Sequence, residues 1–297
     1  MVEATSIPGP ALPLGRRLKL PGRGTTFIRE IEGPPQAPTV LLLHGLVASG
    51  GLNWFQAFGP LSRRFRVIAP DLRGHGRGVR SRRRFRLADC ADDMAVLLDE
   101  LGTGPVIAVG YSMGGPVAQL LWKRHPGHVA GLVLCATSDH FVPGTRERLV
   151  FVTAMTAVAG STRMGQAVAR VPIGMVSRRV PAAIRTRPDT MRAWASAEMR
   201  RHDWRMIAEA AHAIGTYDAR SWIGDIDVPT AVIVTTEDRA VPPADQMRLA
   251  DAIPDARVHR IEDGHTACAH ARFARPLVSA ILYVAEASRS DMRRASG

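Results

Sequence analysis

The sequence is short of lysine, cysteine and aromatic residues. Its two lysines are Lys19 and Lys123, so arginine carries almost all the positive charge behind a formal net charge of +12 in 297 residues. The three cysteines, Cys90, Cys135 and Cys268, are odd in number and widely spaced, which excludes a disulfide framework and a cysteine-based metal site. This cysteine usage fits a reducing compartment, and we expect a cytoplasmic protein.

Long hydrophobic runs are also missing. The longest apolar stretch, residues 149–160, is shorter than the about 18 residues that a membrane span needs. Residues 1–17 lack the sustained apolar segment of about 7–15 residues that a signal peptide contains. We therefore expect neither a transmembrane segment nor a signal peptide.

Six arginines cluster in RGVRSRRRFR, residues 77–86. No aromatic stacking platform or nucleic-acid motif accompanies this run, so we expect no nucleic-acid partner. The run is interpreted as a solvated loop, with peripheral contact to an anionic lipid surface as the alternative.

Apolar segments and helical segments alternate along most of the chain. Apolar runs predict strands over residues 39–45, 67–70, 105–110, 129–137 and 230–236, and two shorter segments with charged residues, 25–30 and 256–261, are further strand candidates. Helical spacing or composition predicts helices over residues 87–101, 116–126, 242–253 and 267–287. Strands buried on both faces and separated by helices imply an α/β fold with a doubly wound, mostly parallel sheet.

The alternation stops in the middle of the chain. Residues 139–222 have no comparable strand signal and hold six of the eleven methionines and three of the five tryptophans. We expect a flexible tail over residues 1–23, a core formed by residues 24–138 and 223–290, a mostly helical cap over residues 139–222, and a C-terminal tail over residues 291–297.

The pattern Gly-Tyr-Ser-Met-Gly, residues 110–114, follows a predicted strand and opens a predicted helix. A tight turn there would strain the backbone of Ser112 and raise its hydroxyl beside the helix N-terminus. A serine nucleophile needs a general base and an acid that orients the base, and in folds with this strand–turn–helix motif they follow in the order Asp/Glu, then His, each after a strand. His265 is the candidate base and Asp238 the preferred acid, with Glu237 and Asp139 as alternatives.

Several stretches together resemble the α/β-hydrolase fold superfamily, in its serine-nucleophile, esterase- and lipase-like branch. They are LLLHGLVASGGLNW, DLRGHG, GYSMGG, TTEDRAVPP and EDGHTA. The resemblance implies a catalytic triad of Ser112, Asp238 and His265, and a helical cap inserted after the sixth core strand. It also implies an oxyanion hole built from the backbone N–H groups of Leu46 and Met113.

The implied activity is hydrolysis of a carboxylic ester (EC 3.1.1) through an acyl-enzyme. A serine at position 112 excludes the relatives that use an aspartate nucleophile. An acyltransferase, a perhydrolase, a carbon–carbon bond hydrolase and a non-catalytic ligand-binding protein remain as alternatives.

Substrate contacts are predicted at His44 and in the cap. His44 precedes the oxyanion loop and is expected to orient it. Met155, Trp194 and Trp204 would line a pocket for an apolar acyl or alkyl group, or would form the core of the cap itself. The histidines lack metal-ligand spacing, so we expect no metal and no cofactor. The sequence leaves the oligomeric state open.

Overall fold

The computed structural model describes residues 10–141 and 190–295. Its centre is an eight-stranded sheet in the order β1-β2-β4-β3-β5-β6-β7-β8. The strands are β1 (Gly15–Leu20), β2 (Gly24–Ile31), β3 (Thr39–Leu43), β4 (Arg66–Pro70), β5 (Val106–Tyr111), β6 (Val129–Cys135), β7 (Thr230–Thr235) and β8 (Arg257–Ile261). β2 is antiparallel to both β1 and β4, and every other neighbouring pair is parallel.

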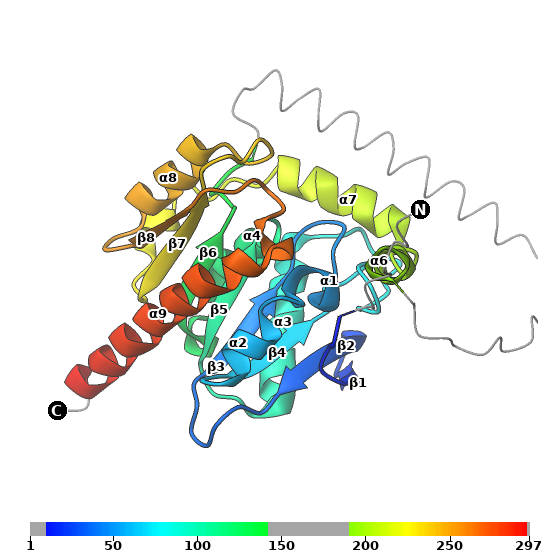
Figure 1. Cartoon of the computed structure of the whole chain (residues 1–297), viewed down its shortest axis with the longest axis horizontal. Helices are drawn as coiled ribbons and strands as arrows, with labels where there is room; N and C mark the ends of the chain where they lie inside the picture. Colours follow the sequence, from blue (N-terminus) through cyan, green and yellow to red (C-terminus); the bar gives the residue numbers. More distant parts are fainter. Residues whose placement is uncertain (1–9, 142–189, 296–297) are drawn as a thin grey trace, which may run out of the picture.

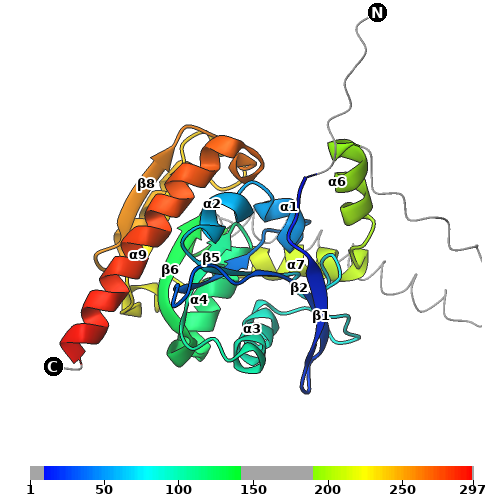
Figure 2. The same ribbon diagram turned by 60° about the horizontal axis from the view of Figure 1, so that its bottom comes forward.

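Helices cover both faces of the sheet (Figures 1 and 2). The longer helices of the core are α3 (Leu87–Leu101), α4 (Gly114–Arg124), α8 (Pro243–Ala252) and α9 (Ala274–Ala295), and two short helices are α1 (Gly50–Trp54) and α2 (Phe58–Ser62). In Figure 2, α2 and α9 lie on one side of the sheet and α3 and α4 on the other. This arrangement confirms the expected doubly wound, mostly parallel fold.

The central strands alternate between two apolar cores. Leu41 and Leu43 of β3 pack into the core beneath α3 and α4, whereas Val40 and Leu42 pack into the core beneath α1, α2 and α9. All four side chains are fully buried. Because both faces are covered, these strands read as unbroken apolar runs in the sequence.

The expected flexible tail over residues 1–23 was wrong for its last part, because residues 15–20 form β1. This strand pairs antiparallel with β2 through a turn that contains Gly22, whose φ is 69°. Only Leu20 of β1 is fully buried, so the strand carries mostly exposed arginine and lysine and lacks the apolar run that marks the central strands. A charged edge strand of this kind disfavours pairing with other chains.

The C-terminal prediction was also wrong in its bounds. Residues 267–273 form two 3-10 turns, Ala267–Ala269 and Ala271–Phe273, before α9 begins, and α9 continues through most of the expected tail over residues 291–297. The apolar face of α9 extends to Val284, and Ser288 then donates a hydrogen bond to the carbonyl of Ala130 at 2.6 Å. This contact holds the helix against β6 beyond its last large apolar residue.

The insertion follows β6, the sixth strand, as expected. Its described part contains α6 (Met191–Met199) and α7 (Trp204–Gly215), capped at their N-termini by the side chains of Thr190 and Asp203. α7 lies beside the carboxyl ends of the parallel strands (Figure 1).

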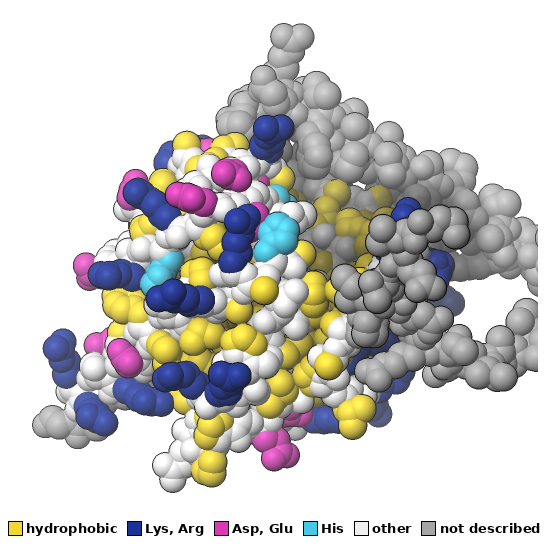
Figure 3. Space-filling model, viewed as in Figure 1, with side chains coloured by type: hydrophobic (Ala, Val, Ile, Leu, Met, Phe, Trp, Pro, Cys, Tyr) yellow, Lys and Arg dark blue, Asp and Glu magenta, His cyan; other side chains and the backbone are white. Residues whose placement is uncertain are grey.

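Arginine and lysine side chains are spread over the surface of the described residues that Figure 3 shows. On the face shown in Figure 3, arginine and lysine side chains are scattered among apolar and acidic ones and do not form one continuous patch. Within residues 10–141 and 190–295, no helix is long and apolar enough to cross a membrane.

Candidate active site

Ser112 occupies the turn between β5 and α4. Its φ of 51° lies in the left-handed region, which is strained for a residue with a side chain. Two hydrogen bonds to the backbone of Ser112 hold this conformation: its N–H donates to the carbonyl of Cys135 at 2.9 Å, and its carbonyl accepts from the hydroxyl of Thr137 at 2.8 Å.

The two glycines of the motif permit the close crossing of strand and helix. A Cβ atom on Gly110 would lie 2.3 Å from the carbonyl oxygen of Gly114, and one on Gly114 would lie 2.1 Å from that of Leu43. No side chain fits at either position. The sequence therefore places Ser112 at the end of β5 and directly before the first turn of α4.

The side chains of Ser112, His265 and Asp238 come from three separate loops and lie together at the site. Nε2 of His265 lies 2.9 Å from Oγ of Ser112, and Nδ1 of His265 lies 2.8 Å from Oδ2 of Asp238. A carboxylate only accepts, so the neutral ring donates from Nδ1 to Asp238 and accepts the serine proton at Nε2. The hydroxyl, the imidazole and the carboxylate thus form one hydrogen-bonded chain.

Asp238 is held from several sides in the turn after β7. Its Oδ1 accepts the backbone N–H groups of Ala240 and Val241 at 2.8 and 2.9 Å, and its Oδ2 also accepts the hydroxyl of Thr235 at 2.8 Å. Burial alone would raise the pKa of Asp238, but the hydrogen bonds from His265 and these donors outweigh it and lower the pKa below its ordinary value. The carboxylate is therefore ionised at neutral pH.

The two alternative acids, Glu237 and Asp139, lie in environments that differ from that of Asp238. Glu237 is exposed. Asp139 is buried, but it accepts hydrogen bonds from Nδ1 of His140 at 2.8 Å and from the hydroxyl of Ser138 at 3.1 Å. Of the three candidates, Asp238 is the carboxylate that the structure brings to His265.

The loop after β3 forms the opposite wall of the site. His44 is fully buried; its Nδ1 donates to the carbonyl of Gly45 at 2.8 Å, and its Nε2 accepts the N–H of Leu72 at 2.9 Å. Burial lowers the pKa of His44 to about 3, so the ring is neutral. The N–H of Gly45 donates to Oδ1 of Asn53 at 3.0 Å, which fixes the approach to Leu46.

A cavity of about 590 Å³ opens over Ser112. Its lining is largely apolar and comes from the β3 loop, the last turn of α7 and the loops that carry Asp238 and His265: Gly45, Leu46, Ala48, Asn53, Tyr111, Ser112, Phe141, Ile214, Gly215, Ala240, Val241, His265, Thr266, Cys268 and Ala269. Most of a medium-sized apolar ligand could be enclosed there.

The residues predicted to form the oxyanion hole and those predicted to contact the substrate lie at different places relative to this cavity. Leu46 lines the cavity, and Met113 is fully buried directly after Ser112. His44 lies behind the loop and does not reach the cavity, and the two predicted tryptophans are also absent from its lining. Trp194 packs against Phe55 with ring centroids 5.6 Å apart, whereas Trp204 is half exposed; neither lines the cavity. Met155 lies outside the described residues.

Sequence reasoning missed two residues beside Ser112. The hydroxyl of Tyr111 donates to the backbone carbonyl of His265 at 2.9 Å, and Asn53 supports the loop of Gly45. Both are polar residues within otherwise apolar sequence motifs, but their positions in the sequence do not indicate which residues they bond to. Among residues 10–141 and 190–295, no group of three or more His, Cys, Asp or Glu side chains is placed to hold a metal ion.

Comparison with known proteins agrees with this fold. Residues 38–268 match the alpha/beta hydrolase fold family. The magnesium-chelatase 30 kDa subunit of Rhodobacter capsulatus is 43% identical over 112 residues, 37% of this chain and 38% of that protein, so the match spans well under half of the relative. The poly(3-hydroxyalkanoate) depolymerase of Ectopseudomonas oleovorans is 28% identical over 235 residues, 78% of this chain and 80% of that protein.

The fold is also shared with solved structures. An esterase from Exiguobacterium antarcticum superimposes with a TM-score of 0.70 at 18% identity, over 90% of this chain and 99% of that one. The family match covers most of the chain and includes the turn of Ser112 and the loops of Asp238 and His265. The chain belongs to the alpha/beta hydrolase fold family.

Proposed function

We propose that this chain is a serine hydrolase that cleaves carboxylic esters with an apolar acyl or alkyl group. The observation that carries the proposal is the hydrogen-bonded chain from Ser112 through His265 to Asp238, which faces a largely apolar cavity. The names of the depolymerase and the esterase support hydrolysis as the class of reaction.

The first half of the reaction forms an acyl-enzyme. Oγ of Ser112 attacks the ester carbonyl carbon while Nε2 of His265 takes the hydroxyl proton, and the carbonyl π electrons move onto the oxygen. The backbone N–H groups of Leu46 and Met113 would stabilise this oxyanion. The carbon–oxygen bond to the alcohol then breaks, and His265 gives its proton to the departing alcohol.

The second half releases the acid. His265 takes a proton from water, whose oxygen attacks the acyl carbon, and then returns that proton to Oγ of Ser112 as the serine ester breaks. Asp238 stabilises the imidazolium that forms in each half and keeps the ring in the tautomer that accepts at Nε2. The strained backbone of Ser112 is tolerated because one oxyanion donor contributes about 3–4 kcal/mol to transition-state binding.

The test is the Ser112→Ala variant with a short p-nitrophenyl ester. We expect kcat to fall at least about a thousandfold, because no nucleophile remains. Ser290→Ala, an exposed serine on α9, is the matched control and should keep wild-type turnover. Wild-type protein should also react with a fluorophosphonate probe that leaves Ser112→Ala unlabelled. Unchanged turnover and labelling in Ser112→Ala would reject the proposal.

A further inference from the structure

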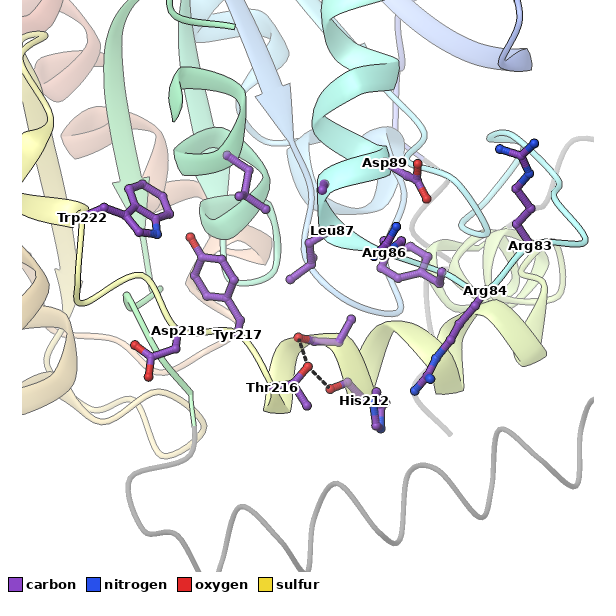
Figure 4. A pocket seen from close by; sticks show the side chains of 14 residues that line it. Arg83, Arg84, Arg86, Leu87, Asp89, His212, Thr216, Tyr217, Asp218 and Trp222 are labelled. Atoms are coloured by element: carbon purple, nitrogen blue, oxygen red, sulfur yellow. Dashed lines mark hydrogen bonds between the residues drawn. The ribbon is translucent and has the colours of Figure 1, made fainter. Parts of the chain in front are cut away.

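A second cavity, drawn in Figure 4, has a volume of about 800 Å³. It is formed by the loop before α3, the first turn of α3, Leu120 of α4, and the chain from the last turn of α7 to Trp222. Neither Ser112 nor its two partners lines it.

The arginine run divides into two groups at this cavity. Arg77 is paired with Glu198 at 3.2 Å, and Arg80 donates to the carbonyls of Gly76 and Arg201, so both tie the loop to the cap. Arg83, Arg84 and Arg86 are instead exposed, and all three line the cavity.

These three guanidinium groups lack a carboxylate partner within the described part of the chain. In Figure 4, Arg84 extends from the loop toward α7, whereas Arg83 points away from it. Exposed arginines without partners are free to bind an oxyanion through two parallel N–H groups.

The acidic side chains of the lining do not neutralise this charge, because they are already paired elsewhere. Asp89 lies 3.4 Å from Arg23 and 3.7 Å from Arg73, and Asp218 is paired with Arg220 at 2.6 Å. The charge of Arg84 and Arg86 at this cavity is therefore not neutralised by the acidic side chains of its lining.

The rest of the lining is apolar and aromatic. Leu87 and Tyr217 are buried at its base, and Leu120 and Trp222 are half-buried beside them. Charge at the rim and apolar surface at the base match a molecule that has both an anionic group and an apolar body.

We propose that this cavity is a binding site for a small amphiphilic oxyanion, in which a phosphate or carboxylate group is attached to an apolar chain or ring. The concave shape favours a single molecule over a lipid surface. The two large apolar side chains that are most exposed in the described residues, Leu14 and Trp204, lie outside this lining and so give the arginines no adjacent anchor for a membrane.

The site adjoins the Ser112 cavity through one helical turn. Ile214 and Gly215 of α7 line the cavity over Ser112, whereas Ala213 and Thr216 line the arginine cavity. A ligand in the second cavity would therefore contact the turn that forms one wall of the first. The binding proposal itself does not depend on the proposed hydrolase activity.

The test is calorimetric titration of the full chain with octyl phosphate below its micelle concentration. We expect binding in the wild type and an affinity at least about tenfold lower in the double variant Arg84→Gln/Arg86→Gln, since two charge-assisted contacts are lost. Arg82→Gln is the matched control, because Arg82 belongs to the same run and is exposed but does not line the cavity. It should change the affinity by less than about twofold.

Three further measurements separate the sources of the anion. Octanoate should bind through the same arginines, inorganic phosphate should bind more weakly than octyl phosphate because it lacks the apolar body, and Trp222→Phe should remove the tryptophan fluorescence change on binding. Equal affinity of the double variant and the wild type for octyl phosphate would overturn the proposal. So would binding confined to phosphatidylglycerol vesicles, which would indicate a membrane surface instead.

Discussion

At the scale of single residues, the two oxygens of Asp238 have separate tasks. Oδ1 faces the backbone donors of Ala240 and Val241, and Oδ2 faces Nδ1 of His265. Because the two oxygens have different partners, the effect of replacing Asp238 with asparagine can be predicted.

In Asp238→Asn, the backbone donors will hold the amide oxygen at the Oδ1 position, so the NH₂ group will face His265. The ring must then accept at Nδ1 and carry its proton on Nε2, where it can no longer take the proton of Ser112. We expect kcat to fall about a thousandfold or more for a p-nitrophenyl ester. Glu237→Gln, at the neighbouring exposed acid, should retain turnover. Near-normal turnover in Asp238→Asn would contradict the assigned role.

Tyr111 is a positioning residue for His265. Its hydroxyl donates to the His265 carbonyl at 2.9 Å, while its ring packs edge-on against Trp54 with centroids 6.1 Å apart. Tyr111→Phe keeps the ring and removes the hydrogen bond, whose net value of about 0.5–1.5 kcal/mol predicts a fall in kcat of about twofold to tenfold. Steady-state kinetics should show little change in KM. A rise in KM at constant kcat would instead place the hydroxyl in substrate binding.

At the scale of elements, the arginine-rich loop connects the core to α6 and α7 of the insertion. Phe85 of this loop donates its N–H to Glu209 of α7 at 2.7 Å, and Glu209 also accepts from Arg205 at 2.8 Å. Both charged side chains are buried. Such a pair does little for stability by itself, but breaking it leaves an uncompensated buried charge.

Glu209→Gln should therefore destabilise the protein by about 1–3 kcal/mol, because the buried Arg205 then keeps only Asp203, at 3.8 Å, as a carboxylate partner. The free energy of unfolding in urea measures the effect. Glu286→Gln, at an exposed position of α9, is the control and should stay within about 0.5 kcal/mol of the wild type. If both variants unfold alike, α7 is not anchored through this pair.

The sequence predicted elements best where burial is uniform. α3 was predicted at its observed bounds, and the loops of Ser112 and Asp238 follow fully buried strands, whereas the loop of His265 follows β8, which is partly exposed. β1 was missed because it has few apolar residues among its arginines and lysine. The contacts of Arg77 and Arg80 were missed because their partners are distant in the sequence or are backbone carbonyls. For Trp194 and Trp204 the sequence left two alternatives open, pocket lining or the core of the cap, because composition does not reveal which way a helix faces.

At the scale of the whole molecule, a group of buried histidines links stability to pH. The rings of His44 and His75 lie 5.1 Å apart, and that of His202 lies 5.7 Å from His75. Burial lowers the pKa of each, in His44 to about 3 from an ordinary value of 6.5. All three are held neutral in the folded protein at neutral pH.

Acid should therefore weaken the fold before the carboxylates titrate. Between pH 6.5 and 3 the unfolded chain binds a proton at His44 that the folded chain does not, so the free energy of unfolding falls as the pH falls, by about 1.4 kcal/mol per pH unit for this residue. Above pH 6.5 the contribution is constant. His44→Gln removes the titrating ring, and its amide oxygen can still accept from Leu72. Urea unfolding at pH 7.5, 6.5, 5.5 and 4.5 should give this variant a shallower pH dependence than the wild type, by about one proton. Parallel pH profiles for the two proteins would mean that the His44 ring is not held neutral by the fold.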